Sequence, residues 1–413
     1  MALTACGSSS SSSSTDKASG GAGGAVTLKL VAADYGTAGT ANSSQSYWQG
    51  IADAFHKANP TITVDVQTID WNDWTTKTTT MLQNKQYPDI MEGDAPQSFA
   101  ADGLLYPLSD VMSASTIGNL IPSFAKQENG TDGVAYGAPF TTSTRALFYN
   151  KKIFTEAGIA SPPQTWADIQ TDAAKIKALG KGYIGYGLPL GSEEPQGESY
   201  MWMLGNGGGY VDGSGNYTLN SAANVGTFTF LKGLIAAGAT EPSPATTNRQ
   251  QMWDAFSSGQ VGMVGGSGAL LPDIQKNAKL TASDYATVAM PGKSGPLTTP
   301  LGVHDDITAF KANNHAAQIK KFLDFAYSDQ YQQQFSKEYD LLPATTSASK
   351  ALAAADPVQA AFINNIATSV GYPTNANWNT VLAKLKTTLG TTVTGNPSSV
   401  LGSLQSFAKS ATS

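Results

Sequence analysis

The chain has 413 residues, of which 41% are hydrophobic and 14% are charged, and its formal net charge is −6. That length exceeds the usual size of one hydrophobic core and suffices for two domains. Only two of its 25 basic residues are arginines, Arg145 and Arg249, and no basic run occurs, so the composition argues against nucleic-acid binding.

The N-terminal segment carries the single cysteine, Cys6. The tetrad LTAC, followed by Gly7, resembles the lipobox of bacterial lipoproteins, which implies that Cys6 is a lipidation site. The segment ahead of it lacks the basic and apolar regions of a signal peptide. Residues 7–25 are almost entirely Ser, Gly and Ala, a composition typical of a disordered tether. We therefore interpret residues 1–25 as a lipobox remnant followed by a tether.

The first half of the chain alternates strands with helices. Apolar alternation predicts strands at 26–36, 62–69 and 87–91, and apolar residues at helical spacing predict helices at 44–59 and 71–86. A strand–helix–strand–helix–strand order indicates a parallel sheet with helices on both faces. Ligands of such sheets bind at the carboxyl ends of the strands, here Asp34, Tyr35 and the segment 92–94.

A second α/β unit begins near residue 145. Residues 141–144 form an extended polar run ahead of a strand at 145–150 and a short helix that Gly158 closes. Thr165 is the expected N-cap of the next helix, with Asp168 three residues later. Strands at 183–190 and 260–268 and helices at 199–211, 224–238 and 248–259 complete this unit.

The last third of the chain changes pattern. Residues 291–310 are extended and lead to an amphipathic helix pair at 316–339, and residues 351–413 are predicted to be helical. No internal repeat is apparent, and no segment approaches the roughly 18 apolar residues of a membrane span.

Catalytic and cofactor motifs are matched poorly. The segment GGSG at 265–268 is not a G-x-S-x-G elbow, because Ala269 stands at the last position, and a Ser–His–Asp triad would have to use His304. A transition-metal site needs three or four converging ligands. One histidine with adjacent carboxylates, here His304, Asp305 and Asp306, is interpreted as a hydrogen-bonding patch rather than a metal site. No P-loop occurs. The sequence therefore predicts no cofactor and no metal.

Carboxylates and aromatic residues offer two alternatives. Glu193, Glu194 and Glu198 in one loop leave open a glycoside hydrolase, which needs two carboxylates facing each other across a bond. Acidic and aromatic residues also lie where strands should end, where carboxylates would accept hydrogen bonds from sugar hydroxyls and rings would stack on sugar faces. These residues are Asp34, Tyr35, Trp71, Asp94, Glu194, Trp202 and Trp378.

Four ordered blocks resemble the extracellular solute-binding proteins of bacterial ABC sugar importers, the family that includes the maltose/maltodextrin-binding proteins. They are YPDIMEGDAPQSFAADGLLYPLSD, YGAPFTTSTRALFYNKKIFTEAGIASPPQTWADI, WDAFSSGQVGMVGGSG, and IKKFLDFAYSDQYQQQF with DLLPATTSA. The blocks fall within residues 26–385. The resemblance implies a periplasmic-binding-protein-like fold: two α/β lobes joined by three crossing segments, with a ligand cleft between the lobes.

Applied to this sequence, the resemblance places the crossings at 141–145, 298–306 and 340–344. It implies an N-terminal lobe of residues 26–141 plus 301–341 and a C-terminal lobe of residues 145–300 plus 345–413. It also implies cleft contacts from Asp34, Tyr35, Asp94, Arg145, Glu194, Trp202 and Trp378, with His304 and Asp305 as polar contacts on the second crossing. Ser267 stands where related proteins often place a stacking tryptophan.

The function implied is binding rather than turnover. We expect a lipid-anchored protein on the extracellular face of a bacterial cell membrane, monomeric, that delivers a neutral mono- or oligosaccharide to the transmembrane permease subunits of an ABC transporter. Anionic ligands favour several arginines, and only Arg145 is expected in the cleft. The alternatives are the same fold with a polyol or glycerophosphodiester ligand, and a glycoside hydrolase.

Overall fold

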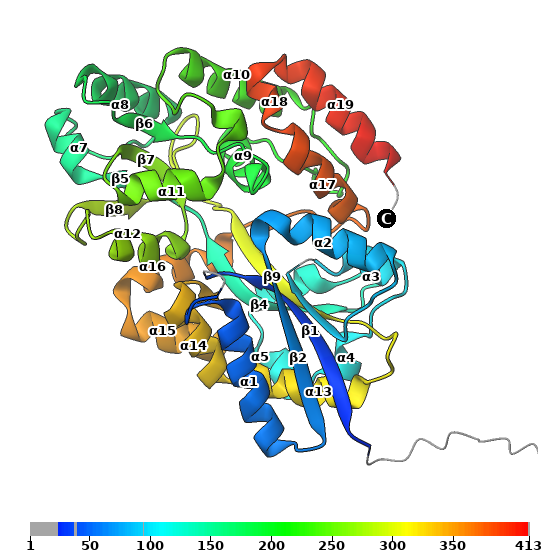
Figure 1. The fold of residues 1–413 in the computed structure, drawn as a ribbon. Coiled ribbons are helices and arrows are strands. Elements are labelled where there is room, and N and C mark those ends of the chain that lie inside the picture. The colour runs from blue at the N-terminus through cyan, green and yellow to red at the C-terminus, as the bar shows by residue number, and fades with distance from the viewer. Residues whose placement is uncertain (1–23, 37–38, 94, 412–413) are drawn as a thin grey trace, which may run out of the picture.

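The computed structural model describes residues 24–36, 39–93 and 95–411, and it forms two α/β lobes (Figure 1). Cys6, the tether up to residue 23 and Asp94 lie outside the described residues. The predicted fold class is therefore confirmed for the body of the chain. None of its described helices has the length and apolarity needed to span a bilayer.

The first lobe is built on a six-stranded sheet with the strand order β10-β4-β9-β3-β1-β2. As predicted, β1 runs parallel to β2 and to β3, whereas β9 is antiparallel to β3 and β4. The strands are β1 (Val26–Asp34), β2 (Ile62–Asp70), β3 (Ile90–Gly93), β4 (Gly137–Thr144), β9 (Gly302–Ala309) and β10 (Leu342–Pro343).

Helices cover both faces of this sheet because successive side chains of β1 point to opposite sides. Leu28 and Leu30 pack in the cluster that holds Trp48, whereas Val31 packs in the cluster that holds Trp74. The helices of this lobe are α1 (Ser44–Ala58), α2 (Trp71–Gln83), α3 (Gln97–Ala101), α4 (Leu108–Val111), α5 (Ala114–Asn119), α6 (Pro122–Ala125), the 3₁₀ turn η1 (Lys126–Glu128), α13 (Ala316–Ala326) and α14 (Asp329–Tyr339).

The second lobe contains a four-stranded sheet with the order β6-β7-β5-β8. Strand β7 is parallel to β6, and β5 is antiparallel to both β7 and β8. Leu147 and Phe148, adjacent on β5, join two different core clusters, so this sheet is also covered on both faces. Its strands are β5 (Ala146–Asn150), β6 (Ile184–Gly187), β7 (Val261–Gly266) and β8 (Tyr285–Val288).

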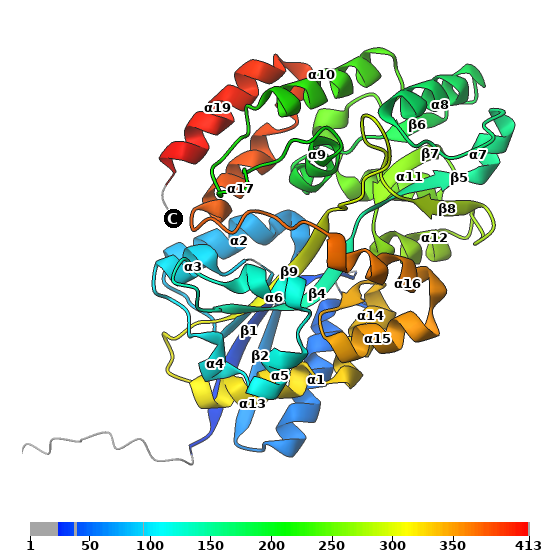
Figure 2. The same cartoon turned by 180° about the vertical axis from the view of Figure 1, so that it is seen from behind.

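Helices surround this second sheet, and α17 to α19 lie beside α9 and α10 on its outer side (Figures 1 and 2). Thr165 caps α8 with Asp168 as its capping-box partner, as predicted. The helices are α7 (Lys151–Glu156), α8 (Trp166–Ala178), α9 (Pro195–Leu204), α10 (Ala222–Ala236), η2 (Pro244–Thr246), α11 (Arg249–Ser257), η3 (Gly268–Leu270), α12 (Leu271–Asn277), η4 (Ile366–Thr368), α17 (Trp378–Thr388), α18 (Thr391–Thr394) and α19 (Pro397–Ser410). Two further helices, α15 (Thr346–Ala355) and α16 (Pro357–Asn364), pack against α14, β10 and β4 of the first lobe, and Phe362 of α16 also stacks on Phe148 of β5.

The chain passes between the lobes three times. After β4 it enters β5 through Arg145, it returns through β9, and it leaves the first sheet again after β10. Residues 142 and 304 are paired in the ladder of β4 and β9, so the first two crossings run side by side. These two strands form the floor on which both lobes meet.

Candidate functional site

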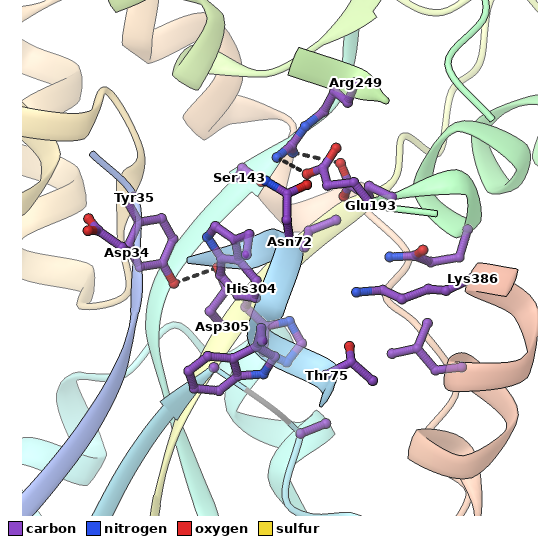
Figure 3. A pocket seen from close by; sticks show the side chains of 18 of the residues that line it. Asp34, Tyr35, Asn72, Thr75, Ser143, Glu193, Arg249, His304, Asp305 and Lys386 are labelled. Carbon is purple, nitrogen blue, oxygen red and sulfur yellow. Dashed lines mark hydrogen bonds and ion pairs between the residues drawn. The ribbon is translucent and has the colours of Figure 1, made fainter. Parts of the chain in front are cut away.

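A cleft of about 1590 Å³ lies between the lobes, lined by both of them and by the crossing strands. Figure 3 shows Asp34, Tyr35 and Asn72 from the first lobe, Glu193, Arg249 and Lys386 from the second, and His304 and Asp305 between them. Nine predicted contacts line this cleft: Asp34, Tyr35, Trp71, Arg145, Glu194, Ser267, His304, Asp305 and Trp378. Their role in ligand binding stays a prediction.

Asp34 stands at the carboxyl end of β1, as the strand pattern indicated. Its Oδ1 accepts hydrogen bonds from the backbone N–H groups of Ser44, at 2.8 Å, and Gly36, at 3.1 Å. Asp34 therefore fixes the loop that leads to α1, and its side chain is only 6% exposed. This carboxylate positions the neighbouring Tyr35 at the edge of the cleft.

The Tyr35 hydroxyl bridges two carboxyl groups, that of Asp305, which lines the cleft, and that of Glu92, which is buried behind it. It lies 2.5 Å from Oε1 of Glu92 and 2.9 Å from Oδ2 of Asp305. Burial raises the pKa of Glu92 well above its usual range and raises the pKa of Asp305 to about 6. Because a phenol has one proton to donate, a proton on one of the two carboxyls lets both hydrogen bonds form.

An aromatic surface extends from Tyr35 along the first lobe. The Trp71 ring meets the Tyr35 ring edge-on at 5.5 Å, and Trp74 lies 5.6 Å beyond it. Trp71 is half-buried and lines the cleft, whereas Trp74 is 1% exposed. Trp71 can therefore offer a ring to a ligand in the cleft.

Ion pairs form the opposite wall. Glu194 Oε1 lies 2.6 Å from Arg145 Nη2, and Glu194 Oε2 lies 2.6 Å from Arg249 Nη1. Glu193 Oε1 adds a third ion pair, at 2.6 Å from Arg249 Nη2. Burial alone would raise the pKa of Glu194, but the two guanidinium groups outweigh it and lower that pKa. Each guanidinium thus has a carboxylate partner within the protein.

The cleft as a whole carries more acidic than basic groups. Among the residues that the structure describes, ten Asp and Glu residues and four Lys and Arg residues line it. Arg145 and Arg249 are already paired, so Lys276 and Lys386 are the remaining basic lining residues. This balance favours a neutral, hydroxyl-rich ligand over an anion.

Of the predicted aromatic contacts, Trp378 lines the cleft and Trp202 does not. Trp378, 2% exposed, stacks on Tyr372 with ring centroids 5.8 Å apart, and both residues line the cleft. Trp202 does not line the cleft: it is 1% exposed in the second-lobe core, where its Nε1 donates to Glu198. The helical spacing of Trp202 fits this core position.

Ser267, at the end of β7, is 1% exposed and its hydroxyl accepts a hydrogen bond from the N–H of Ala269. It lines the cleft without an aromatic ring there. This side chain caps η3, which holds the wall in place.

The loop carboxylates that left a hydrolase open are engaged in the structure. Glu193 and Glu194 hold the arginines, and Glu198 is buried, accepting hydrogen bonds from Tyr186 and Trp202 on Oε1. Burial raises the pKa of Glu198 to about 7. All three carboxylates of the loop therefore have partners within the protein.

Several lining residues were not foreseen from the sequence: Asn72, Arg249, Tyr372 and Lys386. They lie far apart in the chain, in α2, at the start of α11, after η4 and in α17. Local periodicity carries no signal for such positions. The start of α11 could have been singled out, because Arg249 is one of only two arginines.

The fold and this cleft define a two-lobed ligand-binding protein. Residues 38–333 match the family model of the bacterial extracellular solute-binding proteins. The chain belongs to this family, which confirms the resemblance found in the sequence.

Curated relatives differ in the ligands that they are named for. A binding protein of Brucella abortus (strain 2308) is 29% identical over 74% of this chain and 74% of its own length. The diacetylchitobiose binding protein DasA of Streptomyces coelicolor is 26% identical over 73% of this chain and 71% of its own. The sn-glycerol-3-phosphate-binding protein UgpB of Brucella melitensis is 23% identical over 65% and 64%.

Solved structures share the fold. The GacH receptor of Streptomyces glaucescens, solved unliganded and with acarbose, superposes with a TM-score of 0.78 at 22% identity, covering 93% of this chain and 98% of that one. An ABC transporter solute-binding protein of Thermotoga lettingae, bound to α-D-tagatose, gives a TM-score of 0.80 at 18% identity, covering 92% and 98%.

Proposed function

We propose that the chain is the substrate-binding lipoprotein of an ABC importer, and that it captures a neutral sugar or oligosaccharide between its two lobes. The observation that carries this proposal is the cleft of about 1590 Å³, with aromatic rings on both walls and with its two arginines already paired to Glu193 and Glu194. It is a binding protein, not an enzyme. A ligand that touches both lobes favours the closed arrangement, which the permease subunits then recognise.

The same fold with sn-glycerol 3-phosphate as ligand is the main alternative, because UgpB is among the relatives. A phosphate ester brings negative charge into a cleft lined by ten acidic and four basic side chains. Its recognition would require Arg145 or Arg249 to give up a carboxylate partner at 2.6 Å. We therefore favour a neutral ligand.

The anchor is proposed from the sequence. Cys6 in its lipobox-like context would carry the lipid, and the Ser- and Gly-rich stretch after it would tether the body to the extracellular face of the membrane. Metabolic labelling with a radioactive or alkyne fatty acid tests this. Label in the wild type and none in Cys6→Ser is the expected result.

A thermal-shift screen tests the ligand class. The purified chain is melted with neutral mono- and oligosaccharides, polyols and sn-glycerol 3-phosphate, and hits are followed by calorimetry. We expect neutral saccharides to stabilise the fold, by about 2.7 kcal/mol at a hundredfold excess over Kd. Stabilisation by sn-glycerol 3-phosphate alone would replace the neutral sugar with a phosphate monoester as the ligand class.

Two aromatic variants locate the binding. Trp71 and Tyr87 are both half-buried and pack against the same core cluster, but only Trp71 lines the cleft. Trp71→Ala should weaken saccharide binding, whereas Tyr87→Ala should leave affinity unchanged. Product analysis after overnight incubation with each saccharide tests for hydrolase activity. Cleavage by the wild type that disappears in Glu194→Gln would show an enzyme.

A further inference from the structure

A histidine and two carboxyl groups converge on the floor of the cleft. His304 and Asp306 are two apart on β9 and so point to the same side of the sheet, while Asp305 points to Tyr35 on the other. Glu128, the last residue of η1, meets them there. Its Oε1 lies 3.0 Å from Nε2 of His304, which lies 3.5 Å from Oδ1 of Asp306.

The hydrogen-bonding capacity of this cluster is only partly used. The side chains of Glu128 and Asp306 are 1% and 2% exposed, and that of His304 is 10% exposed. Three buried atoms have no hydrogen-bond partner among the described residues: Oε2 of Glu128, Nδ1 of His304 and Oδ1 of Asp306. Unpartnered polar atoms at this depth are uncommon, because each costs free energy unless something satisfies it.

The charge of the cluster is also uncompensated. No Lys or Arg in the described part of the chain forms an ion pair with Glu128 or Asp306. His304 is the basic side chain that meets both carboxyl groups, and a dication bound among the three would neutralise the two carboxylates.

A glycine at the start of β4 leaves space for the Glu128 side chain of this cluster. A Cβ at Gly137 would lie 2.5 Å from Oε2 of Glu128, so only glycine fits there without a shift of the carboxylate. Gly137 is the first residue of β4, which pairs with β9. The three side chains therefore sit where the first two crossings run side by side.

The spacing of the donor atoms suits a small transition-metal ion. All three offer ligand atoms within 4.8 Å of one another. Zn²⁺ binds imidazole nitrogen and carboxylate oxygen at about 2.0–2.2 Å, which puts two ligands of a tetrahedral ion roughly 3.4 Å apart. The separations of 3.0 and 3.5 Å bracket that value. Ca²⁺ takes six to eight oxygens, and one imidazole with two carboxylates suits it poorly.

We propose that Glu128, His304 and Asp306 form a binding site for Zn²⁺ or a similar divalent transition-metal ion on the cleft floor. The ion ties the segment before β4 to β9, and it reaches the site through the cleft, which His304 and Asp306 line. Three protein ligands leave a fourth position for water or for an oxygen of the bound solute.

Calorimetric titration of the full chain with ZnCl₂ after EDTA treatment tests the site. We expect one ion per chain, with proton release that makes the heat depend on the buffer, since the ligands must be deprotonated. His304→Gln and Glu128→Gln should each bind Zn²⁺ at least about tenfold more weakly. Absence of binding by the wild type, or equal affinity in His304→Gln, overturns the proposal.

His315→Gln is the matched control. His315 also faces a buried carboxyl, with Nδ1 2.9 Å from Oδ1 of Asp89, but it belongs to no three-donor cluster in the described residues. This variant should bind Zn²⁺ as the wild type does. Cys6 is a thiol ligand common to all these chains, so it cannot produce the difference between them.

Zinc-edge X-ray absorption of the wild type supplies a measurement that needs no variant. Nitrogen and oxygen neighbours at about 2.0–2.2 Å support the site, whereas a sulfur neighbour at about 2.3 Å assigns the ion to Cys6 and overturns it. Thermal melting of each metal-free variant establishes that it folds.

Discussion

At the scale of single residues, Glu198 illustrates how burial sets a proton affinity. Its carboxyl accepts hydrogen bonds from Tyr186 at 2.8 Å and Trp202 at 2.9 Å, but burial dominates and raises its pKa to about 7 from 4.5. Between those two values the folded chain binds this proton more tightly than the unfolded chain does. Its contribution to stability is therefore present at low pH and is lost as pH rises through about 7.

Glu198→Gln should remove this pH dependence. The glutamine carbonyl oxygen can accept both hydrogen bonds, and the neutral amide carries no charge to bury. At pH 8 the variant should be more stable than the wild type, on the order of 3 kcal/mol for a shift of this size, and this difference should shrink to nearly zero as the pH falls to about 4. Thermal melting of both proteins between about pH 4 and pH 8 measures the difference.

Glu156→Gln is the control for that experiment, because Glu156 is an exposed carboxylate paired with Lys181 at 2.8 Å. Its melting temperature relative to the wild type should show no such gain at pH 8. A Glu198→Gln curve parallel to that of the wild type at every pH would contradict the assignment.

Arg145 and Glu194 form the most buried ion pair of the cleft wall, with side chains 5% and 13% exposed. Removing the Glu194 charge leaves the buried Arg145 without its counterion, at a cost of about 3 kcal/mol, whereas Arg249 keeps Glu193. We expect Glu194→Gln to lower the free energy of unfolding by about that amount, and Arg145→Met to cost less, because Glu194 keeps Arg249. The double variant Arg145→Met/Glu194→Gln should lose less than the sum of the two single variants in urea unfolding. Additive losses would show that the pair is not coupled.

The sequence predicted those site residues that follow a recognisable element. Asp34 and Tyr35 end a strand of clear alternation, and that placement puts them at the cleft. The ion pair of Arg249 with Glu194 joins residues 55 apart, which no local pattern reveals. Glu128 was missed in the same way, since it meets His304 only through the pairing of β4 with β9.

At the scale of elements, the segment Ser-Pro-Pro-Gln-Thr-Trp (residues 161–166) leads into helix α8. The Thr165 hydroxyl accepts from the N–H of Asp168 at 3.2 Å, and the Asp168 carboxylate accepts from the N–H of Thr165 at 2.9 Å. This capping box satisfies donors at the helix start that have no partner within the helix. The structure thus confirms the predicted N-cap, Thr165.

Thr165→Ala should lower the free energy of unfolding by about 1 kcal/mol, because it removes the cap. Thr171→Ala, the same substitution on the exposed face of α8, should cost far less, since alanine is the better helix former. Denaturant titration of both variants gives the comparison. Equal losses would mean that the cap contributes nothing.

Long helices and strands, in which apolar residues repeat regularly over many positions, were predicted well, whereas short elements were not. The strands β1 and β2 and the helices α1, α2 and α8 follow their patterns closely, whereas β3 (Ile90–Gly93) begins three residues after the strand predicted at 87–91. The helices α4 and α6 have four residues each, too few to show a helical period, and all residues of β8 are only half-buried, which blurs its alternation. Helix α9 begins at Pro195, ahead of the predicted start at residue 199, because proline fits the first turn.

At the scale of the whole molecule, the two lobes touch across the mouth of the cleft. Asn379, in α17, donates its Nδ2 to the carbonyl of Ala95 at 3.1 Å, and the Ser98 hydroxyl donates to the carbonyl of Ala376 at 2.5 Å. Such contacts cannot be predicted from the sequence, because they depend on how the two lobes are oriented. They favour this arrangement over one in which the lobes are apart.

Asn379→Ala should therefore shift the lobes toward the open arrangement even without ligand. One lost hydrogen bond is worth about 1 kcal/mol, which changes the ratio of open to closed molecules roughly fivefold. Small-angle X-ray scattering should show a larger radius of gyration for this variant. The matched control is Asn375→Ala, since Asn375 donates to Gly215 at 2.9 Å within the second lobe, and its radius should equal that of the wild type. Identical scattering from all three chains would mean that the contacts at the mouth do not hold the lobes together, and closure would then depend on the ligand alone.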